Sequence, residues 1–320
     1  SNSVMRSNRR DPAANDQLLT DVLAGLARTQ KRLPSKYFYD AAGSRLFDRI
    51  TELDEYYPTR TELAIMRAHA GAMAARCGPR CLLVELGAGS LLKVRLLLDR
   101  LDRPAGYVPV DVSGDHLRAA AAELSRDYPE LAVHSVAADF TRAFALPPLS
   151  AARRVTYFPG STLGNFDPHE ADALLGRVAR LVGPGGGLLL GVDLRKDTSV
   201  LEPAYNDARG VTAAFNRNLL VRINRDLGAD FDPSAFRHRA FYNREHSRIE
   251  MHLVSETAQR VRVGDRAFAF RAGETIHTEN SYKYDLAELA ARAATCGLRT
   301  DETWTDEHGH FAVLYLTATR

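Results

Sequence analysis

The sequence predicts an α/β fold in which a parallel sheet is interrupted by one inserted α+β segment. Between about residues 60 and 194, short apolar runs alternate with stretches of helical periodicity, which is typical of a parallel sheet with crossover helices. Between about residues 196 and 282 the pattern changes. There, Arg248–Leu253 alternates polar and apolar side chains, which indicates antiparallel strands with one exposed face.

The elements of the sheet follow from this alternation. Apolar runs of strand length cover residues 81–86, 107–111, 131–140, 154–158 and 188–194. Helical periodicity covers residues 61–76, 92–101, 117–127 and 167–182, and Ser113 and Asp167 are the expected N-caps of the last two helices. After the insertion the α/β pattern returns, with a helix that ends at Gly297 and strands over 298–304 and 311–317.

This organisation predicts two domains and a tail. Residues 61–195 together with 284–320 form the α/β domain, and residues 11–60 together with 196–283 form a second domain that binds substrate. The polar residues 1–10 are expected to be a flexible tail, because they lack the apolar core of a signal peptide.

Composition excludes several classes of protein. The chain of 320 residues has 42 Lys plus Arg and 40 Asp plus Glu, a net charge of +2, which argues against a nucleic-acid binder. No apolar run approaches the roughly 18 residues of a membrane helix. Cys77, Cys81 and Cys296 are too few for a disulfide framework and are not spaced for zinc. We expect a cytoplasmic monomer with reduced thiols that binds a small molecule, and neither nucleic acid nor membrane.

A glycine-rich turn follows the first expected strand, in the segment Glu85-Leu86-Gly87-Ala88-Gly89. Glycines at this place let a ligand approach the backbone at the carboxyl edge of a parallel sheet. A dinucleotide fingerprint would need a third glycine where Leu92 stands, and no Gly-Lys-Ser/Thr is present to hold a triphosphate. The turn resembles the first motif of class I methyltransferases that use S-adenosylmethionine (SAM), although a purely structural turn is the alternative.

Acidic residues end the next two expected strands. Asp111 ends the second strand, where a carboxylate can accept hydrogen bonds from ribose hydroxyls, and Asp139-Phe140 ends the third, where an acid and a ring can meet adenine. Each residue alone is more often a helix cap or a core aromatic. Three such features after three successive strands favour a cofactor site.

The loop after the fourth strand, residues 159–166, is the expected substrate loop. Its glycines, such as Gly160, admit close backbone approach, and Asn165 offers both a hydrogen-bond donor and an acceptor. The loop lies at the same sheet edge as the expected cofactor site, which favours a role in substrate binding over a purely structural one.

Five motifs, taken in order over about residues 20–320, are similar to those of the histidine-specific Nα-methyltransferases of ergothioneine biosynthesis. The motifs are Tyr37-Phe38-Tyr39-Asp40, Glu55-Tyr56-Tyr57-Pro58-Thr59-Arg60, Gly160-Ser161-Thr162-Leu163-Gly164-Asn165, Ala214-Phe215-Asn216-Arg217-Asn218 and Thr278-Glu279-Asn280-Ser281-Tyr282-Lys283. The resemblance implies a Rossmann-like class I SAM methyltransferase sheet with an inserted α+β substrate domain.

The resemblance also implies the site residues. Cofactor contacts fall on Tyr56, Gly87, Lys93, Asp111, Asp139 and Phe140. Substrate contacts fall on Tyr39, Gly160, Asn165, Tyr205, Met251, Glu279 and Ser281, and the catalytic residues are Tyr39 and Asn165. In the family, Asn165 and Tyr205 hold the amino-acid carboxylate. Tyr39 orients the α-amine, and Glu279 and Ser281 bind the imidazole; a period-two strand puts these last two on one face.

The implied reaction is SAM-dependent trimethylation of L-histidine to hercynine, with SAM as methyl donor and no metal. Positioning a neutral amine in line with the sulfonium methyl supplies most of the catalysis. Methylation of another amino acid, such as tryptophan, and a catalytically silent SAM-binding module are the alternatives. The segment Ser90-Leu91-Leu92-Lys93-Val94 has Leu and Val where some members carry polar residues, so the groups that meet the methionine carboxylate stay open.

Overall fold

The computed structural model describes residues 12–320 and divides them into two compact units. Unit 1 comprises the described residues up to Tyr56 together with Asp197–Asn280. Unit 2 comprises Tyr57–Lys196 together with Ser281–Arg320. The tail predicted for residues 1–10 lies outside the described residues.

Unit 2 contains a seven-stranded mixed sheet with the order β12-β13-β6-β5-β2-β3-β4. Neighbouring strands from β6 to β4 are parallel, whereas β13 runs antiparallel to both β6 and β12. The predicted α/β class I methyltransferase sheet is thereby confirmed. The strand bounds are β2 (Cys81–Leu86), β3 (Gly106–Asp111), β4 (Val136–Ala137), β5 (Arg153–Phe158), β6 (Gly187–Asp193), β12 (Leu298–Thr305) and β13 (Phe311–Ala318).

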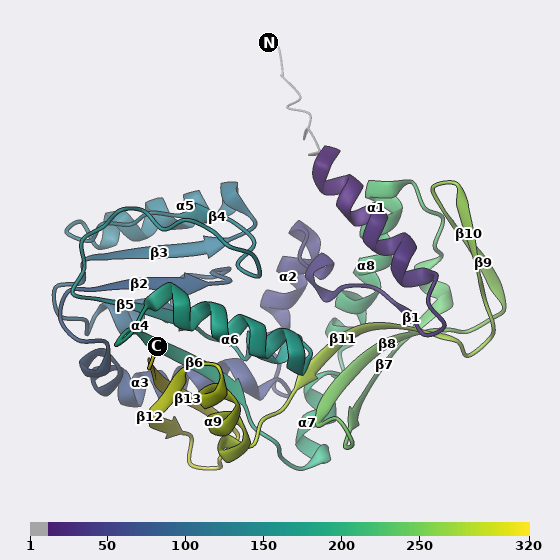
Figure 1. The fold of residues 1–320 in the computed structure, drawn as a ribbon. Coiled ribbons are helices and arrows are strands. Elements are labelled where there is room, and N and C mark those ends of the chain that lie inside the picture. The colour runs from purple at the N-terminus through teal and green to yellow at the C-terminus, as the bar shows by residue number, and fades with distance from the viewer. Residues whose placement is uncertain (1–11) are drawn as a thin grey trace, which may run out of the picture. The chain divides into compact units, whose positions relative to one another are not determined.

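Helices cover both faces of this sheet (Figure 1). Leu82, Val84 and Leu86 of β2 belong to a buried core shared with α6 and α9. Leu83, on the opposite face of β2, belongs to the core shared with α3, α4 and α5. Burial on both faces explains why the strand reads as a continuous apolar run. The helix bounds are α3 (Tyr57–Cys77), α4 (Leu92–Leu98), α5 (Gly114–Asp127), η2 (Thr162–Asn165), α6 (Pro168–Val182) and α9 (Leu286–Thr295).

Three local predictions in unit 2 were wrong. The strand predicted over 131–140 is paired only at Val136–Ala137, with an isolated bridge at Val133, because it is the edge strand and leaves the ladder after two residues. Ser113 and Asp167 occupy the expected N-cap positions, but neither side chain caps its helix. The Tyr282 hydroxyl instead donates to Asp167 Oδ1 at 3.2 Å.

Unit 1 contains the antiparallel strands predicted for the insertion. Its main sheet has four strands in the order β1-β11-β8-β7, and β9 and β10 form a separate hairpin. Only the pair β1–β11 is parallel among the registers described for this unit. The bounds are α1 (Pro12–Leu26), β1 (Lys31–Arg32), η1 (Ser35–Phe38), α2 (Ala41–Ile50), α7 (Thr198–Ala204), α8 (Val211–Leu227), η3 (Pro233–Ala235), β7 (Phe236–Asn243), β8 (Arg248–Ser255), β9 (Gln259–Val263), β10 (Arg266–Phe270) and β11 (Thr275–Tyr282).

Two further features bear on the class of protein. Cys77, Cys81 and Cys296 are free thiols, the first two buried, as expected. Within residues 12–320, no helix has the length and apolar character needed to cross a membrane.

Candidate cofactor and substrate sites

The turn after β2 is built tightly against two neighbouring segments. The backbone N–H groups of Gly87 and Ala88 both donate to the Val110 carbonyl, at 2.9 and 3.1 Å. Gly87 has a φ of +68°, and a Cβ atom there would lie 3.3 Å from the Phe140 ring. Glycine is therefore needed both for the left-handed backbone and for the close approach of the ring.

The two predicted acidic residues lie at the carboxyl ends of the adjacent strands. Asp111 ends β3, and its Oδ1 accepts from the Ser113 N–H at 3.0 Å. Asp139 follows β4, and its Oδ1 accepts from the backbone N–H and the hydroxyl of Thr141 at 2.9 and 2.6 Å. Since β2, β3 and β4 are parallel neighbours, the fold brings Gly87, Asp111 and Asp139 to one edge of the sheet.

Lys93 has a buried partner that the sequence analysis missed. Its Nζ lies 2.6 Å from Oε1 of Glu62, a buried carboxylate on α3. The same carboxylate accepts from the Gly160 N–H, at 3.1 and 3.0 Å to its two oxygens. A Cβ atom on Gly191 would clash with Glu62 Oε2, so β6 leaves room for this side chain only because residue 191 is glycine. Glu62 thus joins a predicted cofactor residue to a predicted substrate residue.

A second buried carboxylate, Glu85 on β2, has a different environment. The Tyr107 hydroxyl donates to its Oε1 at 2.5 Å. Burial raises the pKa of Glu85 to about 7, because this hydrogen bond and the Lys93 charge offset the loss of hydration only in part. Glu85 is therefore partly protonated near neutral pH.

The loop with Gly160 and Asn165 packs against β6 and against the last residue of β11. The Ser161 N–H donates to the Gly191 carbonyl at 3.1 Å, and the Asp193 N–H donates to Ser161 Oγ at 2.9 Å. A Cβ atom on Gly164 would lie 2.8 Å from the Tyr282 carbonyl oxygen, so only glycine permits this approach. Asn165 ends the short helix η2 that follows.

Asp193, at the end of β6, is the centre of a buried charge cluster. Its Oδ2 accepts from Lys283 Nζ at 2.7 Å and from the Tyr57 hydroxyl at 2.5 Å, and its Oδ1 accepts from Lys196 Nζ at 2.8 Å. Burial alone would raise the pKa of Asp193, but the two ammonium charges lower it below its usual value. Burial also lowers the pKa of Lys196 to about 8.

In unit 1, two of the quoted motifs meet at Asp40, the residue after Tyr39. Asp40 caps α2 through its Oδ1, which accepts from the Gly43 N–H at 2.7 Å. Asn218 of α8 donates to the same oxygen at 2.9 Å, and Arg225 donates to Oδ2 at 2.9 Å. These bonds hold the backbone at Tyr39 against α8.

Asn216 connects α8 to the strands that carry other predicted substrate residues. Its side-chain amide donates to His238 Nδ1 at 2.9 Å, and His238 Nε2 donates to the Tyr205 carbonyl at 2.8 Å. The Thr278 hydroxyl lies 2.8 Å from Asn216 Oδ1 and 3.1 Å from the Met251 carbonyl. One buried asparagine therefore links the segments of Tyr205, Met251 and Thr278.

Tyr39 has a polar neighbourhood although 43% of the residue is exposed. Desolvation of its hydroxyl raises the pKa of Tyr39 well above its usual value, and the charge of Glu279 acts in the same direction. Tyr56 and Tyr205 also raise this pKa, and their two rings lie 6.0 Å apart. The structure of unit 1 thus brings together Tyr39, Tyr56, Tyr205 and Glu279.

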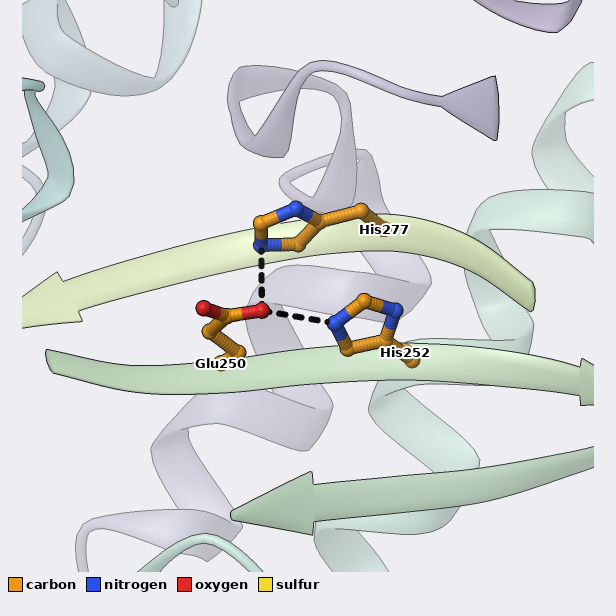
Figure 2. A group of neighbouring side chains, drawn as sticks. All are labelled: Glu250, His252 and His277. Carbon is orange, nitrogen blue, oxygen red and sulfur yellow. Dashed lines mark hydrogen bonds and ion pairs between the residues drawn. The ribbon is translucent and has the colours of Figure 1, made fainter. Parts of the chain in front are cut away.

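Figure 2 shows a further buried group in unit 1, formed by Glu250 and His252 of β8 and His277 of β11. His252 Nε2 donates to Glu250 Oε1 at 2.9 Å, and His277 Nε2 lies 3.7 Å from the same oxygen. Burial lowers the pKa of His277 to about 4 and lowers that of His252. Burial alone would raise the pKa of Glu250, but its hydrogen bonds bring it to about 2. The group is therefore one carboxylate beside two neutral imidazoles.

These three residues have the side chains of a metal site, with ligand atoms within 4.8 Å of one another. Each of the three already has hydrogen-bond or ion-pair partners, and the two imidazole rings stack at 4.4 Å with an interplanar angle of 12°. An ion would have to displace these bonds and turn one ring, because ligation uses the in-plane lone pair. We interpret the group as a hydrogen-bonded link between β8 and β11.

The strand β11 departs from regular alternation beside this group. His277 Nε2 donates to Asn280 Oδ1 at 2.7 Å, although a period-two strand would put these residues on opposite faces. The same nitrogen lies 3.2 Å from the Glu279 carbonyl oxygen. This bond does not involve the side chains of Glu279 and Ser281, and their pairing on one face of the strand stays a prediction.

The predicted site residues divide between the two units. Tyr39, Tyr56, Tyr205, Met251 and Glu279 lie in unit 1, whereas Gly87, Lys93, Asp111, Asp139, Phe140, Gly160, Asn165 and Ser281 lie in unit 2. Glu62, Asp193 and Asn216, which contact predicted site residues or the segments that carry them, were not predicted. A signal existed for Asp193, which ends a strand as Asp111 does, and for Asn216, which lies in a quoted motif. The sequence around Glu62 carries no comparable signal.

Comparisons with known proteins agree with these features. A profile of the SAM-dependent, histidine-specific methyltransferases matches residues 18–318. The chain is 45% identical over 306 residues to the histidine N-alpha-methyltransferase of Mycolicibacterium smegmatis, covering 94% of this chain and 95% of that protein. It is 44% identical over 308 residues to the protein of the same name from Mycobacterium tuberculosis, covering 95% of each. It is also 27% identical over 306 residues to the N-methyltransferase imqF of Aspergillus flavus, covering 92% and 83%.

Proposed function

The chain belongs to the SAM-dependent, histidine-specific methyltransferases, and from this membership we propose that it methylates the α-amine of L-histidine. The observation that carries the proposal is the sequence identity of 44–45%, over nearly the full length of the chain, to two histidine N-alpha-methyltransferases. The edge of the unit 2 sheet, with Gly87, Asp111 and Asp139 on adjacent strands, supports SAM as the methyl donor.

In the proposed complex, SAM lies at this edge of the sheet. Asp111 accepts hydrogen bonds from the ribose hydroxyls, and Asp139 and Phe140 contact the adenine. The turn at Gly87 lets the cofactor approach the backbone, and Tyr56 is a further cofactor contact. Lys93 faces the methionine carboxylate, with its charge partly balanced by Glu62.

The amino acid is held by the residues that the resemblance implies as substrate contacts. Asn165 and Tyr205 bind the carboxylate of histidine, and Gly160 and Met251 complete the contacts with the substrate. Tyr39 orients the α-amine with a neutral hydroxyl, because its raised pKa keeps the phenol protonated at neutral pH. Tyr39 is thus a hydrogen-bonding group rather than a general base. Glu279 and Ser281 bind the imidazole.

The chemical step needs a free amine and an aligned methyl group. The amine lone pair forms the N–C bond while the C–S bond breaks, and the electron pair of that bond goes to sulfur. The methyl group is already electrophilic, so in this proposal the residues only position the amine. The amine gives up its proton to water, and the reaction requires no metal. Repetition on the same nitrogen ends at the trimethylated product, hercynine, because a quaternary nitrogen has no lone pair.

Two alternatives define the experiment. An enzyme for another amino acid, such as tryptophan, would use the same cofactor site, and a silent module would bind SAM without turnover. Histidine, its methylated forms and tryptophan are titrated by calorimetry into protein saturated with S-adenosylhomocysteine (SAH). We expect heat from histidine and from its mono- and dimethyl forms. A tryptophan response without a histidine response would reject the proposal.

A further inference from the structure

The charge cluster at Asp193 contacts one of the proposed imidazole-binding residues. Lys283 is fully buried, and its Nζ lies 2.7 Å from Asp193 Oδ2 and 3.1 Å from Ser281 Oγ. The backbone around it is also paired, because the Tyr284 N–H donates to the Asp193 carbonyl at 3.0 Å. The position of the ammonium group relative to Ser281 is therefore determined by the end of β6.

This contact biases the way in which the Ser281 hydroxyl is used. An ammonium group has only donors, whereas a serine hydroxyl has one donor hydrogen and two acceptor lone pairs. Ser281 Oγ accepts from Lys283 with one lone pair, and the hydroxyl hydrogen points away from the ammonium group toward another acceptor. The positive charge 3.1 Å from Oγ disfavours a second N–H donor at this oxygen, which favours Ser281 as a donor toward other groups.

We propose that Lys283, held by Asp193, is a positioning residue that makes Ser281 a hydrogen-bond donor, so that the site accepts the neutral imidazole with its unprotonated nitrogen toward Ser281. This inference rests on the proposed function, in which Ser281 binds the histidine ring. The other ring nitrogen carries its hydrogen and donates to the carboxylate of Glu279.

An acceptor at Glu279 and a donor at Ser281 would favour neutral imidazole over imidazolium and over indole. A neutral imidazole has one donor and one acceptor, which match Glu279 and Ser281. Imidazolium has two donors, so its second N–H would face the donating hydroxyl and the nearby ammonium charge. Indole has a donor and no acceptor nitrogen, so the hydroxyl of Ser281 would lose its partner. Lys283 thus acts on specificity through Ser281.

The cluster itself offers a matched control. Lys196 donates to Oδ1 of the same Asp193 at 2.8 Å and is also buried, but no contact joins it to Ser281 among the interactions described for residues 12–320. Lys283→Met and Lys196→Met each remove one ammonium group from one carboxylate. A general effect of disturbing the cluster would appear in both variants, whereas an effect through Ser281 would appear only in the first.

The experiment measures histidine binding to SAH-saturated protein by calorimetry, with SAH affinity and thermal melting recorded for each variant. We expect Lys283→Met to weaken histidine binding about tenfold, the loss of one buried hydrogen-bond orientation. Lys196→Met should stay within about threefold of the wild type, and SAH affinity should be unchanged in both. Equal losses of histidine affinity in the two variants would overturn the proposal.

The pH dependence of binding tests the protonation state of the ring. Between pH 7.5 and 5.5 the neutral fraction of an imidazole with a pKa near 6.5 falls about tenfold, so wild-type affinity should fall by about that factor. In Lys283→Met the hydroxyl can turn and accept from imidazolium, so the fall should be less than about threefold. The groups that face Lys283 are Asp193, Lys196 and the Tyr57 hydroxyl, and Lys196→Met separates the titration of Lys196 from that of the ring.

The outcomes separate this inference from the proposed function. If wild-type protein methylates histidine but binds it equally well at pH 5.5 and 7.5, the site does not discriminate between neutral imidazole and imidazolium; if it binds more tightly at pH 5.5, the ring is bound as imidazolium. In either case the inference fails alone. If wild-type protein neither binds nor methylates histidine, the proposed function fails as well.

Discussion

The exchange of Glu62 for glutamine tests the link between Lys93, a proposed cofactor contact, and Gly160, a proposed substrate contact. Glu62 is 1% exposed and accepts from Lys93 at 2.6 Å and from the Gly160 N–H at 3.0–3.1 Å. Glutamine has nearly the same shape and keeps one acceptor oxygen. The variant Glu62→Gln therefore removes the charge of the pair and leaves the packing of α3 intact.

The expected cost follows from this geometry. Removing one partner of a buried ion pair costs about 3–5 kcal/mol, and one hydrogen bond to a charged group contributes about 1.5–3 kcal/mol. The side chain of Lys93 is 21% exposed, so water can solvate part of its charge, and the Gly160 bond is retained. We expect a loss of about 2 kcal/mol in stability, which lowers Tm by roughly 4–8 °C for a unit of this size.

Thermal melting and kinetics are measured together. The bond to Gly160, a proposed substrate contact, is retained but loses its charged acceptor, so the KM for histidine should rise severalfold. The control is Glu85→Gln, another buried glutamate of unit 2, whose pKa is raised to about 7 by burial. That carboxyl is partly protonated at pH 7, so its amide analogue should lower Tm less. Equal Tm changes in the two variants, or an unchanged Tm in Glu62→Gln, would refute the reasoning.

Three further changes have defined outcomes. Gly87→Ala should weaken SAM binding measured by calorimetry at least tenfold, because a φ of +68° costs alanine about 1–2 kcal/mol and its Cβ would press on the Phe140 ring; unchanged affinity would contradict this. Glu279→Ala should weaken histidine binding by about 1–3 kcal/mol with SAM affinity retained, and an equal loss of both would indicate misfolding. His277 has a pKa lowered to about 4 by burial, so the folded state binds fewer protons than the unfolded state between about pH 6.5 and 4. Stability should therefore fall on acidification through this window, measured by urea unfolding, and fall less in His277→Gln; parallel curves would exclude a contribution from His277.

The residues at the sheet edge could be predicted from the sequence, because their position depends only on where each strand ends. A parallel strand ends, and the next residues must lie at the carboxyl edge, so Gly87, Asp111 and Asp139 were assigned to one site without knowledge of any packing. The length of the strand predicted over 131–140 was overestimated, because the sequence does not show that it lies at the edge of the sheet. An edge strand has one neighbour, and only two of its residues pair.

The contacts that support the site were not predictable in this way. Glu62 and Gly160 are 98 residues apart, and their bond depends on how α3 packs against the sheet. The departure of β11 from alternation depends on the bond between His277 and Asn280, which no periodicity indicates. Asn216 lies in a quoted motif but was given no role, because its links to His238 and Thr278 follow from tertiary packing.

The central claim is histidine Nα-methylation, and the masses of the reaction products test it most directly. Purified protein is incubated with SAM and each amino acid in turn, and the products are analysed by mass spectrometry with fragmentation. The account predicts that L-histidine gains one, two and finally three methyl groups, all on the α-nitrogen, with SAH formed in equal number. Methyl groups on the imidazole ring, product from another amino acid alone, or no product with any amino acid would contradict it.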